Sequence, residues 1–434
     1  MKKLAIAAAA VTLSIEGMAA GFALYEVSAR GNGMNGAMVG GMGEKTDAST
    51  LYYNPANMCI STNAQVLVGT SFLNPFADTA VDRQHLNKMN PGWFTAPHFF
   101  ATIPLSDRFA LGIGEFTEYG MGTEYKNNWI LAEDSYKTTV EQFTMQAAIS
   151  FKATERLRFA AGLRASYFLF SSYQRPNYQN LQRASALMHT MQLPYNYDLG
   201  GKLKGDDWAL GGIGAMSYDI TDDLHFGIVY RSPIRHKING HYSASGHLPI
   251  GGYAPRAYST HGSACANVEL PQSLAVGINW DATDRLRLGY AMTWTQWSTL
   301  KDLHIRTPGT IDTVTGSYSK SRDIHFNWHD ALRFAWAGEY DMTDDWTVRL
   351  GYCYDMDPSG KSGTTMIPGG HRHIIGTGLG WRVWDNLRID FGYNLVFMQA
   401  ESRHIKPQYD TQSYKFQTRN AMSHIVSLSA SYSF

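Results

Sequence analysis

The chain has 434 residues, a formal net charge of zero at neutral pH and a mean hydropathy of −0.27. A neutral chain gives no reason to expect nucleic acid or another polyanion as a partner. Beyond the N-terminus, no apolar run approaches the roughly 18 residues of a membrane-spanning helix, so helical spans are excluded. Aromatic residues nevertheless make up 13% of the chain, and glycine occurs 41 times. Because only alternate residues of a transmembrane strand face lipid, this composition favours a membrane β-barrel.

The N-terminus has the pattern of a secretory signal peptide. Lys2 and Lys3 precede an apolar run over residues 4–15, and small residues follow up to Ala19. The alternative is a buried N-terminal helix. We expect residues 1–19 to be a signal peptide and the mature protein to begin directly after it.

Residues 20–63 show neither strand alternation nor an amphipathic helical stripe. A glycine-rich run at residues 28–41 is followed by a compact polar stretch at residues 46–57. The run contains a G-x-G-x-x-G spacing, but no apolar strand precedes it and no amphipathic helix follows, so a dinucleotide site is not indicated. A compact segment placed before the first strand of a barrel can fold back into its lumen. We therefore expect residues 20–63 to form a plug.

The stretch Asn54-Pro55-Ala56 predicts a self-supported turn in this segment. Pro55 fixes its own φ and biases Asn54 toward extended geometry. The Asn54 side chain can hydrogen-bond the local backbone. From the residues alone, an ordinary turn and a gating element both remain open.

From about residue 64 onward the sequence predicts antiparallel strands. Leu286, Leu288 and Tyr290 share one face, for example, whereas Arg287 and Gly289 share the other. A period of two with one apolar and one polar or small face indicates a half-buried strand. Six short turns rich in Asp, Asn, Ser or Thr connect such strands, near residues 106, 155, 222, 284, 344 and 385.

The connections between these turns are much longer. We place long polar loops at about residues 74–91, 118–141, 171–206, 233–271, 298–330, 355–372 and 399–419. A soluble sandwich would also alternate, but short turns on one side and long loops on the other are typical of outer-membrane barrels. Six turns join twelve strands, and one strand at each end brings the count to about fourteen. The sequence thus predicts an all-β fold, a transmembrane antiparallel β-barrel of about 14 strands over residues 64–434, with a small N-terminal plug (hatch) in its lumen.

The end of the chain indicates the cellular location. The last predicted strand finishes on Phe434, and a terminal strand with a final aromatic residue is similar to the signal of outer-membrane assembly. Trp280, Trp346, Trp381 and Trp384 lie beside short turns, where an interfacial aromatic belt is expected. We expect a multi-pass barrel in a Gram-negative type of outer membrane, in contact with its lipids and lipopolysaccharide.

Four stretches share a pattern with one known family. They are Ala20–Phe22, Ser28–Gly41, Asn54–Asn57 and Tyr119–Tyr125. Together they resemble the FadL-type outer-membrane transporters of long-chain fatty acids and other hydrophobic compounds. The resemblance extends over nearly the whole mature chain and includes the strand count and the plug.

The resemblance implies a passive, plug-gated channel. In that family an amphiphile binds between external loops, passes to a lumenal site near the N-terminus, and leaves sideways through a gap at a kinked third strand. By this similarity Phe22 lies near the lumenal site, and Asn54, Pro55 and Ala56 form the plug turn.

The gap is expected at the third strand, residues 108–116. Gly112 and Gly114 in this strand, and Gly120 beyond it, are plausible positions for a break in the ladder and are predicted as the lateral gate. Glu115 is an unusual residue for this strand and leaves the position of the kink open.

A fatty-acid substrate would need a cation for its carboxylate. Arg158 and Arg164 fall on the inward face and are candidate ligand-binding residues, as the alternation also places Arg287, Arg349 and Arg388 inward. The alternative is that these arginines pair with plug or wall carboxylates such as Asp390. Leu187 and Met191 belong to apolar residues of the third long loop and suit an external groove, or else a self-packed loop.

Other functions find little support in the residues. His371 and His373 lack an evident third ligand, no G-x-S-x-G is present, and we expect no enzyme activity, no metal and no cofactor. Cys59, Cys265 and Cys353 are too few for a disulfide framework, and their pairing stays open. The alternatives to fatty-acid transport are uptake of aromatic hydrocarbons, an outer-membrane lipase or a polar-solute porin. A plugged barrel has no need of partner subunits, and we expect a monomer.

Overall fold

The computed structural model describes residues 21–82, 85–89, 92–132, 134–175, 200–248, 256–311, 318–361, 364–406 and 413–434. The predicted signal peptide lies outside these ranges, as do Leu187 and Met191. None of the helices in the described ranges is long and apolar enough to cross a membrane.

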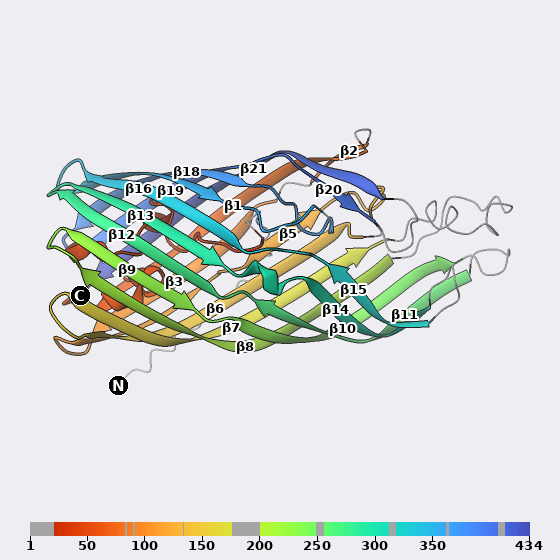
Figure 1. The fold of residues 1–434 in the computed structure, drawn as a ribbon, viewed down its shortest axis with the longest axis horizontal. Coiled ribbons are helices and arrows are strands. Elements are labelled where there is room, and N and C mark those ends of the chain that lie inside the picture. The colour runs from red at the N-terminus through yellow and green to blue at the C-terminus, as the bar shows by residue number, and fades with distance from the viewer. Residues whose placement is uncertain are drawn as a thin grey trace.

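The wall is an antiparallel sheet that closes on itself. Closure follows because β1 (Gln65–Val81) pairs with β3 (Phe94–Pro104) on one side and with β21 (Tyr414–Ser433) on the other. From there, neighbouring strands pair in chain order around the barrel (Figure 1). The other strands that cross the wall in one piece are β6 (Lys137–Lys152), β7 (Leu157–Gln174), β8 (Gly200–Asp219), β17 (Trp346–Asp355) and β18 (Arg372–Trp384).

Seven further wall strands are each divided into two labelled pieces. One consists of β3 with β2 (His85–Lys88); the others are β4 (Phe109–Phe116) with β5 (Gly120–Glu124), β9 (Leu224–Arg231) with β10 (Ile234–Leu248), β12 (Ser273–Thr283) with β11 (Arg256–Leu270), β13 (Leu286–Thr295) with β14 (Asp302–Ile311), β16 (Ala331–Asp341) with β15 (Tyr318–His325), and β19 (Leu387–Met398) with β20 (Glu401–Ile405). Seven whole and seven divided strands make a barrel of 14, which confirms the predicted fold class.

The short turns are where the sequence placed them. They join β3 to β4, β6 to β7, β8 to β9, β12 to β13, β16 to β17 and β18 to β19, at the end of the barrel where the C-terminus lies (Figure 1). Several long loops were predicted too long. Residues 233–271 and 298–330 contain the strand pairs β10–β11 and β14–β15, and β8 already begins at Gly200. These strands were missed because they do not have an apolar outer face.

The polarity of the wall reverses along its length. In β8 the outward residues change from Leu210 and Trp208, which are 71% and 56% exposed, to Asp206, Lys204 and Lys202. Apolar outward side chains belong in hydrocarbon, an exposed Trp is typical of its boundary, and charged ones belong in water. The barrel therefore continues beyond the membrane on the side of the long loops, and there its inward face becomes apolar.

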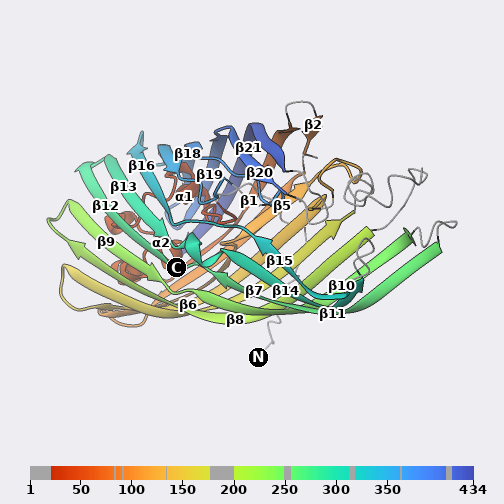
Figure 2. The ribbon, with the colours of Figure 1, turned by 45° about the vertical axis from the view of Figure 1, so that its right-hand side comes forward.

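The N-terminal segment, residues 21–64, lies inside the barrel. It forms α1 (Ala29–Gly33), η1 (Gly43–Lys45), α2 (Thr50–Tyr53) and η2 (Pro55–Ile60), and Figure 2 shows α1 and α2 enclosed by strands. The α1 helix contacts β17, β18, β19 and β21, whereas η2 contacts β4, β6, β7 and β8 across the lumen. The segment thus bridges opposite sides of the wall at the end with the short turns.

Candidate functional site

A buried charge network fixes the N-terminal segment to the wall. Arg30 of α1 binds both oxygens of Glu339 in β16, at 2.8 and 2.9 Å, and also lies 3.0 Å from Asp47. Glu339 additionally accepts from Arg287 at 2.8 Å and from Arg349 at 2.6 Å. Burying a charge is costly unless it is paired and hydrogen-bonded, and both Arg30 and Glu339 have several such partners. The network therefore determines where α1 sits in the lumen.

The predicted turn at Asn54 is a second anchor. The Asn54 side chain accepts from the Ala56 backbone N–H at 3.1 Å, which is the local hydrogen bond expected from the sequence. Its amide also donates to Val39 O at 2.7 Å within the segment and to Met216 O at 3.1 Å in β8. Pro55 begins η2, and Asn54 and Ala56 are both fully buried. The turn thus connects the segment to itself and to the wall.

The third wall strand is interrupted beside the N-terminal segment. Between β4 and β5, Glu118 O accepts from Leu24 N at 2.7 Å, and Gly120 N donates to Phe22 O at 2.9 Å. These two hydrogen bonds form an isolated antiparallel bridge between Ala23 and Tyr119. β5 pairs with β6, but within the described ranges no ladder joins it to β3. At this point the start of the chain takes the place of a neighbouring wall strand.

The three glycines predicted for the gate occupy two kinds of position. Gly120 is the first residue of β5 and flanks the interruption. Gly112 and Gly114 lie within β4 and pair regularly with both β3 and β6. A Cβ at Gly112 would overlap Met58 Sδ and come within 2.8 Å of Leu51 Cδ1, so this glycine allows the close approach of the N-terminal segment to the wall. A Cβ at Gly114 would meet Phe100 and Phe99 O of β3 first. The interruption itself falls at residues 117–119.

Glu118 lies within the interruption, and its side chain is buried. Its carboxylate is paired with Arg164, lies 3.6 Å from Arg231 and accepts from Thr144 at 2.8 Å. Arg231 also donates to Tyr52 O and lies 4.5 Å from the centre of the Tyr52 ring. Burial raises the pKa of the Tyr52 hydroxyl to about 12, so it stays protonated at neutral pH. A chain of contacts thus connects the broken strand to α2.

The two arginines predicted as ligand-binding residues already have protein partners. Arg164 pairs with Glu118, and Arg158 pairs with Asp219. Asp390, expected as a partner of inward arginines, lies 2.8 Å from Arg349 and 3.1 Å from Arg388. These contacts correspond to the alternative in which inward arginines neutralise wall carboxylates.

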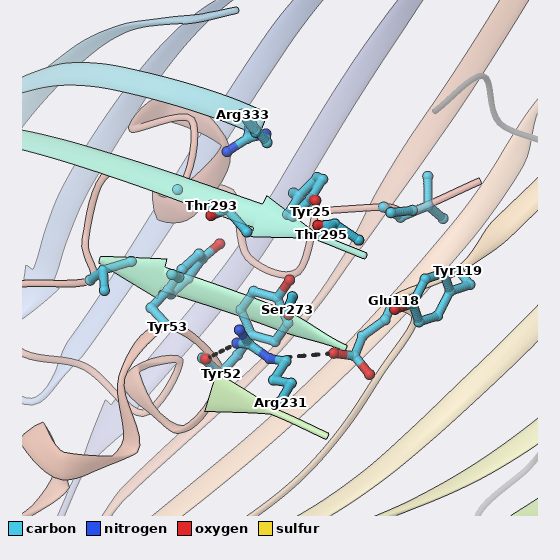
Figure 3. Close-up of a pocket in the computed structure, with 15 residues that line it drawn as sticks. Tyr25, Tyr52, Tyr53, Glu118, Tyr119, Arg231, Ser273, Thr293, Thr295 and Arg333 are labelled. Carbon is cyan, nitrogen blue, oxygen red and sulfur yellow. Dashed lines mark hydrogen bonds and ion pairs between the residues drawn. The ribbon is translucent and has the colours of Figure 1, made fainter. Parts of the chain in front are cut away.

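A small cavity with both charged and apolar residues in its lining lies between the segment and the wall. Its volume is about 50 Å³, and Tyr25, Tyr52, Glu118, Arg231 and Arg333 are among the residues around it (Figure 3). Arg333 is 6% exposed and donates from Nη1 to Asn35 O at 3.0 Å. It forms no ion pair with a described carboxylate, and its Nε has no hydrogen-bond partner among the described residues. The guanidinium carbon of Arg333 lies 4.3 Å from the centre of the Tyr25 ring.

Sequence reasoning did not single out Arg231 or Arg333. Each lies near an end of its strand piece, one at the last residue of β9 and the other close to the start of β16. The inward alternation of β16, which also turns Glu339 into the lumen, could have found Arg333.

A cluster of aromatic rings lies next to the cavity, whose lining includes Tyr119. Phe22 lies 5.6 Å from Tyr119, 5.1 Å from Trp297 and 6.0 Å from Trp328, measured between ring centres. Trp297 begins the short helix η4 (Trp297–Thr299), and Trp328 lies between β15 and β16, so both occupy interruptions of the wall strands. The predicted position of Phe22 near a lumenal site is consistent with this cluster. The two tryptophans carry no sequence signal, because they belong to irregular backbone.

An apolar inner wall continues from the cluster toward the long loops. Ile238 in β10, and Leu303 and Ile305 in β14, are buried members of the same cluster. They also line a second small pocket together with Phe170 and Leu203. Apolar side chains of β10 and β14 thus belong to the same buried cluster as Phe22.

A closed 14-stranded barrel with an apolar outer band, short turns at one end and a segment folded into its lumen defines an outer-membrane transport barrel. The chain belongs to the family described as outer membrane protein transport protein (OMPP1/FadL/TodX), whose model matches residues 10–434.

Relatives with curated names match almost the full length. The 47 kDa outer membrane protein of Pasteurella multocida is 26% identical, over 99% of this chain and 97% of the relative. The long-chain fatty acid transport protein of Escherichia coli K12 is 22% identical, over 92% of each chain.

Solved structures share the fold. A FadL homologue of Pseudomonas aeruginosa has a TM-score of 0.81 at 23% identity, covering 95% of this chain and 100% of its own. The Pseudomonas putida toluene transporter TodX has a TM-score of 0.68 at 17% identity, covering 90% and 94%. Family and fold place the protein in the outer membrane, as a transport protein for hydrophobic compounds.

Proposed function

We propose that this protein carries long-chain fatty acids, or similar amphiphiles with an anionic head group, passively across the outer membrane. The observation that carries the proposal is the position of this cavity. Its lining includes Ala23 and Tyr119, which belong to the apolar cluster around Phe22. It also includes Glu118, which lies beside Tyr119 in the interruption of the third wall strand. One cavity thus adjoins an apolar binding surface, two arginines and a discontinuity in the wall.

The chemistry of the cavity favours a head group with negative charge. Arg333 is a buried cation whose Nη1 donates to Asn35 O at 3.0 Å but whose Nε has no hydrogen-bond partner among the described residues. A buried cation is costly unless an anion approaches it. A carboxylate placed there would gain charge-assisted hydrogen bonds. Its alkyl chain would lie against Phe22 and the tryptophans, where burial contributes roughly 0.8 kcal/mol per methylene. Relatives named long-chain fatty acid transport proteins support this choice.

The proposed route uses the N-terminal segment as a movable plug. A substrate descends the apolar inner wall to the cluster and displaces Phe22, Ala23 and Leu24 from the broken strand. The interval between β3 and β5 then opens toward the membrane, and the substrate leaves sideways. We assign residues 20–63 to the plug, residues 64–434 to the barrel and residues 1–19 to the signal peptide. We expect a monomer surrounded by lipopolysaccharide, since the sheet closes on itself through the pairing of β1 with β21.

Uptake in cells that lack their own transporter tests this assignment. Labelled hexadecanoic acid and the matched alcohol should both enter through the intact chain. With Arg333→Gln we expect uptake of the acid at low concentration to fall by about tenfold, the equivalent of one charge-assisted hydrogen bond of ~1.4 kcal/mol, and uptake of the alcohol to change little. Lys361→Gln, a cation outside the cavity lining, is the control. Equal loss for acid and alcohol would contradict a head-group role.

A second candidate substrate class is the aromatic hydrocarbons. Five aromatic residues of the cluster, Phe22, Tyr119, Trp297, Phe326 and Trp328, offer ring faces and edges to a flat ligand. A solved neighbour is named a toluene transporter. Toluene uptake without fatty-acid uptake, at equal surface levels, would replace the first assignment with this one.

A further inference from the structure

The connection from β17 to β18 turns into the barrel instead of extending away from it. Thr364, Thr365, Met366, Ile367 and Gly369 are all buried. Met366 and Ile367 belong to the same apolar cluster as Phe22. A polar external connection would be expected in solvent, so its burial over an apolar surface requires specific contacts to hold it there.

One end of this connection is held by a carboxylate of another loop. The Asp134 Oδ2 atom accepts from Thr364 Oγ1 at 2.7 Å, from Thr365 N at 2.6 Å and from Thr365 Oγ1 at 2.7 Å. Asp134 follows β5 along the chain, and β5 lies across the lumen from β17. Thr123 of β5 donates to Met366 O at 2.9 Å, and Tyr125, directly after β5, donates to Thr365 O at 3.4 Å.

The other end is held by an arginine from β20. Arg403 is 3% exposed, donates to Ile367 O at 3.0 Å and lies 3.7 Å from Asp357. A Cβ at Gly369 would overlap the Arg403 guanidinium, so this approach requires glycine. Gly370 has a φ of +149°, which also favours glycine.

We propose that residues 364–370 form an external lid over the aromatic cluster, latched by Asp134 and Arg403. The lid packs on Met121 and its apolar neighbours, and it covers the cluster from the side of the long loops. Opening separates Asp134 from the two threonines and exposes the cluster to a substrate from outside. The role of the lid in substrate entry rests on the proposed function, but whether the lid is closed can be measured without a transport assay.

Thiol labelling of intact cells tests the lid directly. In a chain carrying Cys59→Ser, Cys265→Ser and Cys353→Ala, Met121→Cys places a single thiol beneath the lid. A membrane-impermeant maleimide should label it slowly, and adding Asp134→Ala should raise the labelling rate by about tenfold or more, because a carboxylate that accepts three hydrogen bonds is lost. Asp82→Ala is the matched control, since this aspartate accepts from Lys415 N in a different pair of loops.

Two labelling outcomes would overturn the lid. In one, Met121→Cys already reacts as fast as an exposed thiol in the parent chain. In the other, Asp134→Ala changes labelling no more than Asp82→Ala does.

A reversible lock links the lid to transport. The side chains of Asp134 and Thr365 are in contact, with Oδ2 and Oγ1 2.7 Å apart. With the three native cysteines replaced and Met121 retained, Asp134→Cys with Thr365→Cys should form a disulfide on oxidation, lower fatty-acid uptake by about tenfold and recover on reduction. Unchanged uptake in the cross-linked protein would overturn the lid and leave the transport function intact. If the chain with native cysteines transports no fatty acid, the proposed function fails, and the labelling result alone still decides the lid.

Discussion

Arg30 of the N-terminal segment and Glu339 of β16 form a two-point ion pair inside the barrel, with Nη2–Oε1 at 2.8 Å and Nε–Oε2 at 2.9 Å. They are 309 positions apart in the chain, and both are almost completely buried. The pair therefore connects the N-terminal segment, which is proposed to move, with the wall of the barrel.

Arg30→Ala should loosen α1 without unfolding the wall. Removing one member of a buried pair typically costs about 3 kcal/mol, although here Arg287 and Arg349 still neutralise Glu339. Amide hydrogen exchange of residues 29–34 should accelerate, and planar-bilayer conductance should rise. Arg156→Ala removes an exposed pair with Asp222 and should cost less than about 1 kcal/mol. Identical exchange in the two variants would show that the network does not hold the segment.

Gly289→Ala should displace the segment from the wall. A Cβ at this position would overlap Ala37 O and approach Asn279 Nδ2 to 2.7 Å, whereas the outward face of β13 is untouched. We expect an assembled barrel whose N-terminal segment is cleaved more readily by protease. Gly214→Ala, with no heavy atom within 4 Å of its added Cβ, should behave as the parent chain. Equal protease resistance would mean that the segment accommodates the methyl group.

Asn54→Ala removes three hydrogen bonds at once, to Val39 O, Met216 O and Ala56 N. Leaving buried partners unsatisfied should destabilise the segment by about 2–3 kcal/mol. Under the proposed function, fatty-acid uptake should fall at equal surface levels, because the plug no longer returns to one resting position. Asn63→Ala, at an exposed position just before β1, is the control. Uptake equal to that of the control would leave the turn a structural feature only.

A cross-link at the interruption of the wall should close the proposed exit. Ala23 and Tyr119 face each other as an antiparallel bridge, so Ala23→Cys with Tyr119→Cys is placed for a disulfide. Oxidation should block uptake and reduction should restore it. Each single cysteine variant should be insensitive to oxidant. If the oxidised double variant transports normally, substrate leaves by another route.

The reversal of wall polarity can be checked with the native cysteines. Cys265 lies on the outward face of β11 among polar residues and is exposed, whereas Cys353 faces inward in β17 and is fully buried. An impermeant thiol reagent added to intact cells should modify Cys265 and spare Cys353. The chain with Cys265→Ser should lose the signal. Protection of Cys265 would place the membrane boundary farther out than Trp208.

The periodicity of the sequence was sufficient for the barrel itself. Alternation such as that of Leu286–Thr295 reports which side chains face lipid, and short polar turns such as residues 342–345 report where strands reverse. These are local properties, because lipid imposes the same requirement on every strand. Where the wall leaves the hydrocarbon, as in β10 and β14, that requirement ends, and the strands were mistaken for loops.

The local chemistry of Asn54-Pro55-Ala56 was also readable, since its cap joins residues two positions apart. The site was not. Glu339 meets Arg30, Arg333 meets Tyr25, and Trp297 meets Phe22 only because the wall closes around the start of the chain. Strand period fixes the face on which a side chain lies but not its height or its partner across the lumen. The sequence by itself determined an outer-membrane barrel of about 14 strands, and the tertiary structure alone decided which buried charges, rings and loop residues meet inside it.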